Sequence, residues 1–170
     1  MGIVDDRMNE LGLVLPPAIV PPAGVVLPFA PVRVVGDRVV FSGHGPQAAD
    51  GSVAGPFGQV GAEVDIDEAY AAARSTTLSI LGSLRRELGD LDRITGWVRI
   101  FGMVNSAPGF DRQPAVVNGC SDLLIEIFGP EVGAHARSAV GMAALPFGIP
   151  VEIEGEVTVT RRRLTHVAAG

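Results

Sequence analysis

The sequence contains no lysine, so all 13 basic residues are arginines. A Schiff-base lysine, the lysine of a phosphate-binding loop and a Ser-Lys dyad are therefore excluded. The single cysteine, Cys120, cannot form an internal disulfide, which indicates a reducing compartment. The three histidines, His44, His135 and His166, stand far apart and show no metal-ligand spacing. No amine nucleophile, disulfide or metal cluster is expected.

Charge is also scarce, at 19% of the residues with a net charge of -6. Nucleic acid is not an expected partner, because the only basic run, Arg161 to Arg163, is short and close to the C-terminus, where we expect a solvated tail. Residues 11 to 32 carry no charge, but six prolines would leave too many unpaired backbone groups for a membrane span. The first residues lack the cationic lead of a secretory signal, and the expected location is cytoplasmic.

Apolar residues make up 47% of the 170, which predicts one folded domain, and 22 glycines with 13 prolines predict a turn-rich one. We expect a short helix at 5–12, a proline-rich arm to about 23 and a hairpin of strands 25–35 and 38–42 turning at Gly36-Asp37. Asp65 and Glu68 form a capping-box pattern that opens a helix ending at Gly89. The later elements are expected to be a strand at 94–104, a helix at 111–128 and strands at 137–144 and 151–161.

This order predicts an α+β domain (β-β-α-β-α-β-β) with two helices packed on one face of a mixed sheet. The predicted division is an arm at 1–24, a domain at 25–161 and a tail at 162–170. The last strand alternates apolar residues with Glu152, Glu154 and Glu156, so the pattern does not identify one face of the sheet as simply solvent-exposed. Oligomerisation is the expected way to cover the second face.

Gly43-His44-Gly45-Pro46 resembles part of a dinucleotide fingerprint, but Pro46 and the run at 50–52 are incompatible with the helix whose N-terminus would bind the pyrophosphate. The segment 136–146 is more informative, with Arg137-Ser138 opening a strand, a Leu145-Pro146 turn, and Val151-Glu152-Ile153 on the next strand. This segment resembles the C-terminal signature of the RidA family, also called YjgF. Ser42-Gly43, Pro46 and Asn118 extend the resemblance, which covers residues 25 to 160.

The resemblance implies a homotrimer of chorismate-mutase-like domains with a central barrel and a ligand cleft between each pair of subunits. It also implies hydrolysis of reactive 2-imino and enamine acids, such as 2-aminoacrylate and 2-iminopropanoate, to 2-oxo acids and ammonia without a cofactor or metal. Arg137 would hold the substrate carboxylate and Glu152 the attacking water. The other substrate-binding positions implied by the family are Phe29, Ser42, Gly43, Asn118, Ser138 and Ala139.

The chemistry of the residues is compatible with this implication, because the planar guanidinium of Arg137 can bind a carboxylate bidentately. The alternative role for Arg137 is an ion pair with Glu152 or Glu154 across adjacent strands, and Asn118 could equally be a cap or loop anchor. The chain departs from the family pattern at Ala139, at Phe29 in place of tyrosine, and at His44 and His135, which could carry protons or be structural.

A second hypothesis is a trimer that binds small carboxylates as a sensor or partner-binding module without turnover. A third, endoribonuclease, is disfavoured by the acidic balance, the lack of lysine and the absence of a histidine pair for acid-base cleavage.

Overall fold

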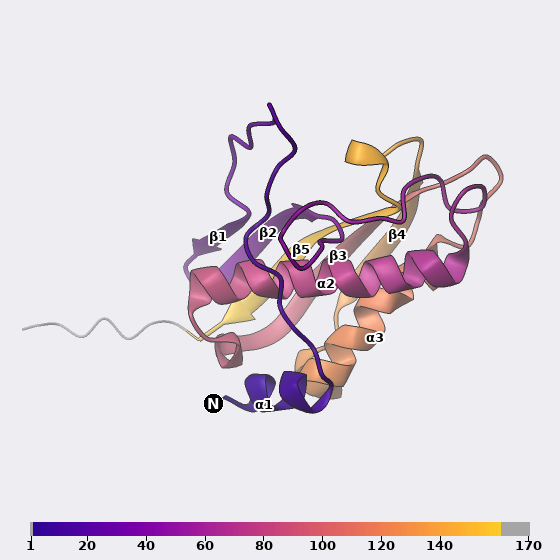
Figure 1. The fold of residues 1–170 in the computed structure, drawn as a ribbon. Helices are drawn as coiled ribbons and strands as arrows, with labels where there is room; N and C mark the ends of the chain where they lie inside the picture. The colour runs from indigo at the N-terminus through magenta and orange to yellow at the C-terminus, as the bar shows by residue number, and fades with distance from the viewer. Residues whose placement is uncertain (1, 161–170) are drawn as a thin grey trace, which may run out of the picture.

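The computed structural model describes residues 2–160, so the run Arg161 to Arg163, His166 and the predicted tail at 162–170 lie outside the described residues. The described residues form three helices, two short 3-10 turns and five strands (Figure 1). Their bounds are α1 Ile3–Glu10, β1 Val32–Val35, β2 Arg38–His44, α2 Ile66–Leu88, η1 Leu91–Arg93, β3 Ile94–Asn105, α3 Gln113–Val132, β4 Ala136–Met142, η2 Pro146–Gly148 and β5 Val151–Val159.

The five strands form one sheet in the order β1-β2-β5-β3-β4. Neighbouring strands are antiparallel except for β3 and β4, which are parallel and joined through α3. The predicted α+β fold with a mixed sheet is therefore confirmed. The structure is of one chain, so the predicted trimer and barrel stay predictions.

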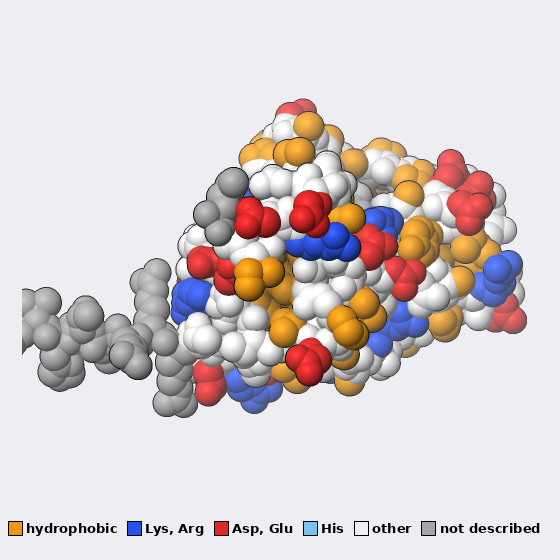
Figure 2. All heavy atoms as spheres, turned by 90° about the horizontal axis from the view of Figure 1, so that it is seen from below, with side chains coloured by type: hydrophobic (Ala, Val, Ile, Leu, Met, Phe, Trp, Pro, Cys, Tyr) orange, Lys and Arg blue, Asp and Glu red, His pale blue; other side chains and the backbone are white. Residues whose placement is uncertain are grey.

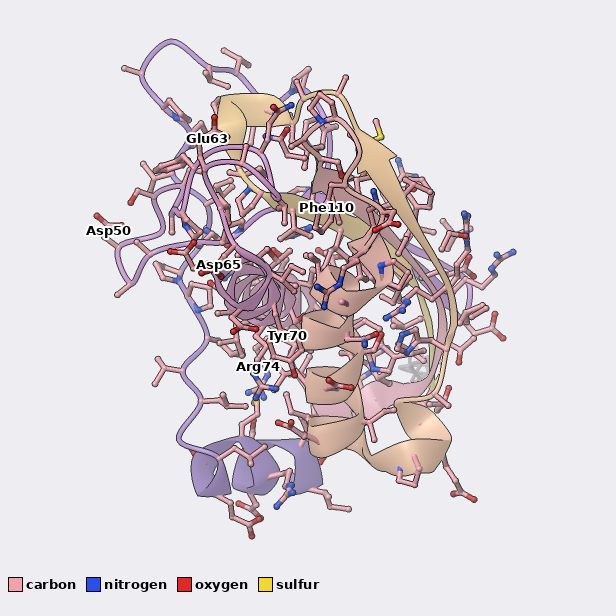
Figure 3. All side chains as sticks on the ribbon, turned by 90° about the vertical axis from the view of Figure 1, so that its right-hand side faces the viewer. Asp50, Glu63, Asp65, Tyr70, Arg74 and Phe110 are labelled. Atoms are coloured by element: carbon pink, nitrogen blue, oxygen red, sulfur yellow. The ribbon has the colours of Figure 1, made fainter. Side chains whose placement is uncertain are left out.

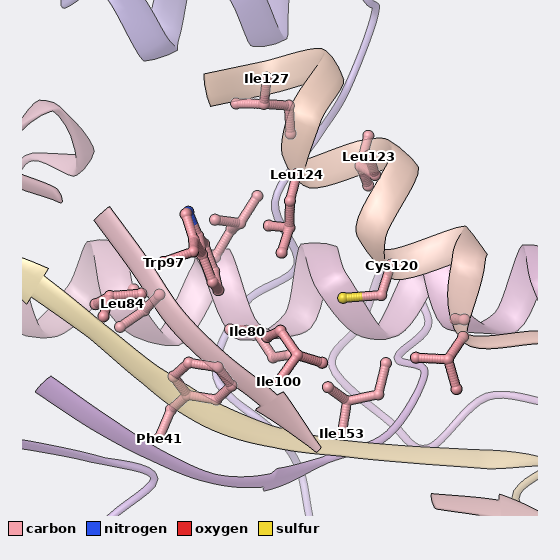
Figure 4. Packing of buried hydrophobic residues seen from close by; sticks show 14 of the residues in the cluster. Phe41, Ile80, Leu84, Trp97, Ile100, Cys120, Leu123, Leu124, Ile127 and Ile153 are labelled. Carbon is pink, nitrogen blue, oxygen red and sulfur yellow. The ribbon is translucent and has the colours of Figure 1, made fainter. Parts of the chain in front are cut away.

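The core lies between the sheet and the pair of helices α2 and α3 (Figure 4). Trp97 and Ile100 of β3 pack beneath Leu124 and Ile127 of α3, with Ile80 of α2 close by (Figure 4). The apolar residues predicted for one side of the last strand are buried in this layer, namely Val151, Ile153, Val157 and Val159. The opposite face of the sheet is bare in the single chain, as the exposure of Val40, Val98 and Met142 shows.

Local sequence signals account for both ends of α2 and for the hairpin turn. Asp65 accepts a hydrogen bond from the backbone of Glu68, whose side chain accepts one from the backbone of Asp65, which confirms the capping box. Gly89, at a φ of 80°, ends α2 as predicted. The hairpin turns at Gly36, also at positive φ, with β1 and β2 in antiparallel register.

Some predicted boundaries are wrong. Residues 25–31 are not a strand, since Pro28 and Pro31 have no N–H to donate to a ladder, and β1 begins only at Val32. Helix α3 begins at Gln113 rather than 111 and runs to Val132, because a break at Gly129 and Pro130 is followed by one more turn. Strand β4 ends at Met142 and β5 at Val159, each two residues before the prediction.

The N-terminal segment lies on its own domain. Val4 and Met8 of α1 join the core, and both carboxylate oxygens of Asp92 accept hydrogen bonds from the first backbone N–H groups of α1. Further along the arm, the Pro16 carbonyl accepts a hydrogen bond from Arg86 of α2. Seen from below, the molecule carries charges of both signs spread among apolar side chains (Figure 2).

Candidate functional site

Arg137 lies on β4 with its side chain toward α3. It is paired in register with Ile100, which faces the core. One guanidinium nitrogen, Nη1, donates to Asn118 Oδ1 and to Ser121 Oγ, both at 2.9 Å, while Nη2 reaches the Pro114 carbonyl at 3.5 Å. All of these acceptors are neutral. Within residues 2–160, Arg137 takes part in none of the ion pairs, so its charge is not compensated there.

The hydrogen bonds use Arg137 unevenly. Both N–H groups of Nη1 are taken by α3, whereas Nε–H and one N–H of Nη2 point away from these partners. This remaining edge is the one that binds a carboxylate through two parallel hydrogen bonds. Asn118, predicted as a substrate contact or a loop anchor, therefore orients Arg137 in the single chain.

Glu152 lies elsewhere. Glu152, on β5, is paired with Met103 of β3, whereas Arg137 is paired with Ile100 of the same strand. Met103 and Ile100 are three residues apart and face opposite sides of the sheet, so Glu152 and Arg137 do too. The interpretation of Arg137 and Glu152 as residues of neighbouring strands is wrong, because β3 lies between β4 and β5. For the same reason the alternative ion pair between Arg137 and Glu152 or Glu154 is not formed within the chain.

The carboxylate of Glu152 lies over Gly43, where a Cβ atom would collide with Oε1. Burial raises the pKa of Glu152 above its usual value, and the nearby charge of Glu154 raises it further. A half-buried carboxyl with a raised pKa is suited to exchanging protons with a bound water.

Glu152 and Gly43 form part of the wall of a cavity of about 540 Å³ at the end of β2, next to Val32 at the start of β1. Phe29, another predicted site residue, contributes from the segment just before β1. Most of the lining was not predicted from the sequence. It comes from the segment before β1, from α2 and from the β4–β5 connection, and includes Ile19, Leu27, Ser83, Arg86, Phe147 and Ile149. No sequence motif marks these residues, since they meet only through tertiary packing.

His44 also lines this cavity, and both of its ring nitrogens are occupied. Nδ1 lies 2.6 Å from the Ser42 carbonyl and Nε2 lies 2.9 Å from Ser83 Oγ. Burial holds the pKa of His44 below its usual value, which the hydrogen bond to Ser42 opposes and the charge of Arg86 reinforces. Its role in the structure is thus a neutral acceptor for Ser83.

The remaining predicted residues are separated. Ser42 donates to the Ala30 carbonyl and lines a smaller cavity of about 240 Å³ on the bare face of the sheet, together with Glu154. Ser138 is exposed, whereas Ala139 packs against the core, as alternation along β4 requires. Cys120 is fully buried, which raises the pKa of its thiol to about 11, so it is not a thiolate nucleophile.

No helix among residues 2–160 is long and apolar enough to cross a membrane. The same residues contain no group of three His, Cys, Asp or Glu side chains placed to hold a metal ion.

The chain is an α+β domain with two helices on one face of a mixed five-stranded sheet. It carries an uncompensated arginine on one edge strand and, separately, a carboxyl at a cavity. The family model described as "YjgF/chorismate_mutase-like, putative endoribonuclease" matches residues 5–149. The chain belongs to this family.

Several relatives resemble the chain over nearly its whole length. Protein TCP17 of Trypanosoma cruzi is 40% identical over 92% of this chain and 94% of its own. The crystal structure of Atu1372 from Agrobacterium tumefaciens, a protein of unknown function, is 35% identical with a TM-score of 0.80 and covers 92% of both chains. A structure from Shewanella oneidensis, described as a putative endoribonuclease, is 30% identical with a TM-score of 0.81 over 92% of this chain and 99% of its own.

Proposed function

We propose that the protein hydrolyses reactive 2-imino and enamine acids to 2-oxo acids and ammonia, at a site shared between two subunits of a homotrimer. The observation that carries this proposal is Arg137, whose guanidinium has neutral partners and an open Nε and Nη2 edge. Such a group binds a carboxylate strongly, because its charge persists at any physiological pH and its two N–H groups match the two carboxylate oxygens.

The separation of Arg137 from Glu152 supports a site between subunits. The two side chains face opposite sides of the sheet with one strand between them, so a single small substrate cannot reach both in one chain. In an assembly, the Arg137 edge of one chain can face the cavity of the next, which holds Glu152. The bare outer face of the sheet provides a surface for such an assembly.

The reaction needs little besides position and proton transfer. The substrate is a protonated imine next to a carboxylate, and an enamine becomes this species by taking a proton at its terminal carbon. Water adds to the imine carbon, forming a C–O bond and giving one proton to Glu152. The amine nitrogen of the resulting carbinolamine takes this proton back from Glu152. The C–N bond then breaks, ammonia leaves, and the hydroxyl releases its proton to solvent as the C=O bond of the 2-oxo acid forms. The raised pKa of Glu152 favours this proton exchange.

The test generates 2-iminopropanoate from L-alanine with an amino-acid oxidase and follows pyruvate release with and without the protein. Wild type is expected to accelerate release, and Arg137→Ala to lower kcat/KM by on the order of 100-fold or more, since truncating one partner of a charge pair costs about 2–5 kcal/mol. Arg7→Ala, which removes an exposed arginine of α1, is the matched control.

Activity retained in Arg137→Ala with an intact oligomer would contradict the site. Tight pyruvate binding without acceleration for any imine would overturn the catalytic part and favour a carboxylate-binding trimer. Cleavage of RNA by the purified wild type, unaffected by Arg137→Ala, would favour the activity in the family's description instead.

A further inference from the structure

We infer that His135 and Ser121 form a positioning pair that fixes the donor direction of Arg137. This inference rests on the proposed function, because it assigns to the pair the orientation of the group that would hold the substrate carboxylate. The observation is a continuous chain of hydrogen bonds from the Gly133 carbonyl through His135 and Ser121 to Arg137.

The direction of each hydrogen bond follows from the groups involved. The Gly133 carbonyl can only accept, so Nδ1 of His135, at 2.8 Å, carries the proton. In the neutral ring Nε2 is then an acceptor, and the Ser121 hydroxyl at 2.9 Å donates to it. Arg137 Nη1 can only donate, so the Ser121 oxygen accepts from it at 2.9 Å. With the ring neutral, these roles are compatible along the whole chain of hydrogen bonds.

This arrangement matters because a serine hydroxyl rotates freely when nothing holds its proton. With its proton committed to His135, Ser121 directs a lone pair at Arg137 Nη1, while Asn118 accepts from the same nitrogen. Two acceptors on one nitrogen set the plane of the guanidinium. The Nε and Nη2 edge is thereby aimed before any ligand binds, which lowers the ordering cost of binding.

The backbone fixes the first member of the chain. Gly133 follows α3 directly, and a Cβ there would lie 2.7 Å from the carbonyl oxygens of both Leu124 and Gly129. Only glycine allows this close passage, which brings the Gly133 carbonyl and His135 back along α3. Asn118 and Ser121 are three residues apart on α3 and so share one face, opposite the start of β4. His135 itself is half-buried there.

Two substitutions at residue 135 separate the parts of this role. In His135→Gln the side-chain oxygen can take the place of Nε2 and accept from Ser121. In His135→Asn the amide can take the place of Nδ1 and donate to Gly133, but nothing reaches Ser121. We expect His135→Gln to keep the wild-type KM and His135→Asn to raise it about fivefold with kcat unchanged, the effect of one lost hydrogen bond.

A double-mutant cycle tests the connection through Ser121. Ser121→Ala is expected to raise KM by a similar factor, and His135→Asn to add nothing in that background. Ser79→Ala, which removes a buried hydroxyl bonded only to the backbone of α2, is the control and should leave KM unchanged. Equal KM values for His135→Asn and His135→Gln, or additive effects of His135→Asn and Ser121→Ala, would overturn the inference. Labelling of Ser121 by a fluorophosphonate would also overturn it, because the serine would then be a nucleophile.

A second readout does not depend on activity. The nitrogen chemical shifts of His135 in the labelled wild-type protein should report a neutral ring with the proton on Nδ1, and the Nε2 shift should move in Ser121→Ala. A proton on Nε2 would contradict the assigned directions. If wild type neither hydrolyses imines nor binds pyruvate, the proposed function fails, and these shifts alone decide whether the positioning chain exists.

Discussion

The tight contact between α2 and α3 at Gly119 predicts that Gly119→Ala disturbs the site through the fold. Gly119 is buried on α3 against α2, and a Cβ there would overlap the Tyr70 carbonyl oxygen and lie 3.0 Å from the carbonyl carbon. The hydrogen bond from the Tyr70 hydroxyl to Asp122, at 2.9 Å, joins the helices near this crossing (Figure 3). Arg74 of α2 also pairs with Glu126 of α3.

The size of the effect follows from these distances. Carbon atoms pack at roughly 3.5–4.0 Å, so the helices have to separate by about 1 Å. Overpacking of this kind costs about 1–3 kcal/mol, and the better helix propensity of alanine returns up to about 1 kcal/mol. We expect a net loss of about 1–2 kcal/mol and a fall in Tm of roughly 2–8 °C.

The same shift should reach Arg137. Asn118 and Ser121 flank Gly119, and a movement of about 1 Å would stretch their 2.9 Å hydrogen bonds to Arg137 beyond useful length. Calorimetry would measure Tm, and the imine assay should show a raised KM. Ile125→Ala, at an exposed position of α3, is the control for changes to the helix alone. A raised Tm with an unchanged KM would refute the reasoning, since alanine would then fit at the crossing.

Two further predictions concern the cavity. Glu152→Gln should lower activity and stabilise the protein relative to wild type. The raised pKa of Glu152 means that the folded state binds the carboxyl proton more tightly than the unfolded state does. The wild-type protein therefore loses stability as the pH rises above about 4.3, the pKa of an unperturbed glutamate. The Tm difference between Glu152→Gln and wild type should therefore grow from pH 4 to pH 7, and a constant difference would contradict the cause. The apolar lining and the volume of about 540 Å³ favour substrates larger than 2-iminopropanoate, so 4-methyl-2-oxopentanoate should bind at least about tenfold more tightly than pyruvate. Equal or weaker binding in a calorimetric titration would contradict this expectation.

The fold could be predicted largely from local signals. Each of these signals acts over a few residues, so its structural effect can be predicted from the sequence; they are the capping box at Asp65, the glycine at 89 and the alternation of β5. The errors occurred where two local signals competed. Residues 25–31 combine β-branched residues with prolines, and the missing N–H groups decided the outcome.

The candidate site was harder to predict because it depends on which strands are neighbours. The spacing of Arg137 and Glu152 along the chain suggests adjacent strands, but β5 inserts between β2 and β3 and leaves β4 at the edge. The face of each side chain then follows from its register with β3, which the sequence does not reveal. Arg86 and Phe147 could not be predicted for a similar reason, since they reach the cavity from α2 and from the β4–β5 connection, which are distant in the sequence.

The two histidines that depart from the family pattern have the same structural role. His44 bonds the Ser42 carbonyl through Nδ1 and Ser83 through Nε2, and Ser83 accepts from Arg86 Nη2 at 3.0 Å. His135 makes the equivalent bonds between the Gly133 carbonyl, Ser121 and Arg137. In each case a backbone carbonyl fixes the tautomer, so the imidazole orients a serine that holds an arginine. A neutral imidazole suits this role because it is both a donor and an acceptor. It also carries no negative charge, so it does not compete with a ligand carboxylate for the arginine. Within residues 2–160, His44 and His135 are therefore each placed to orient an arginine through a serine.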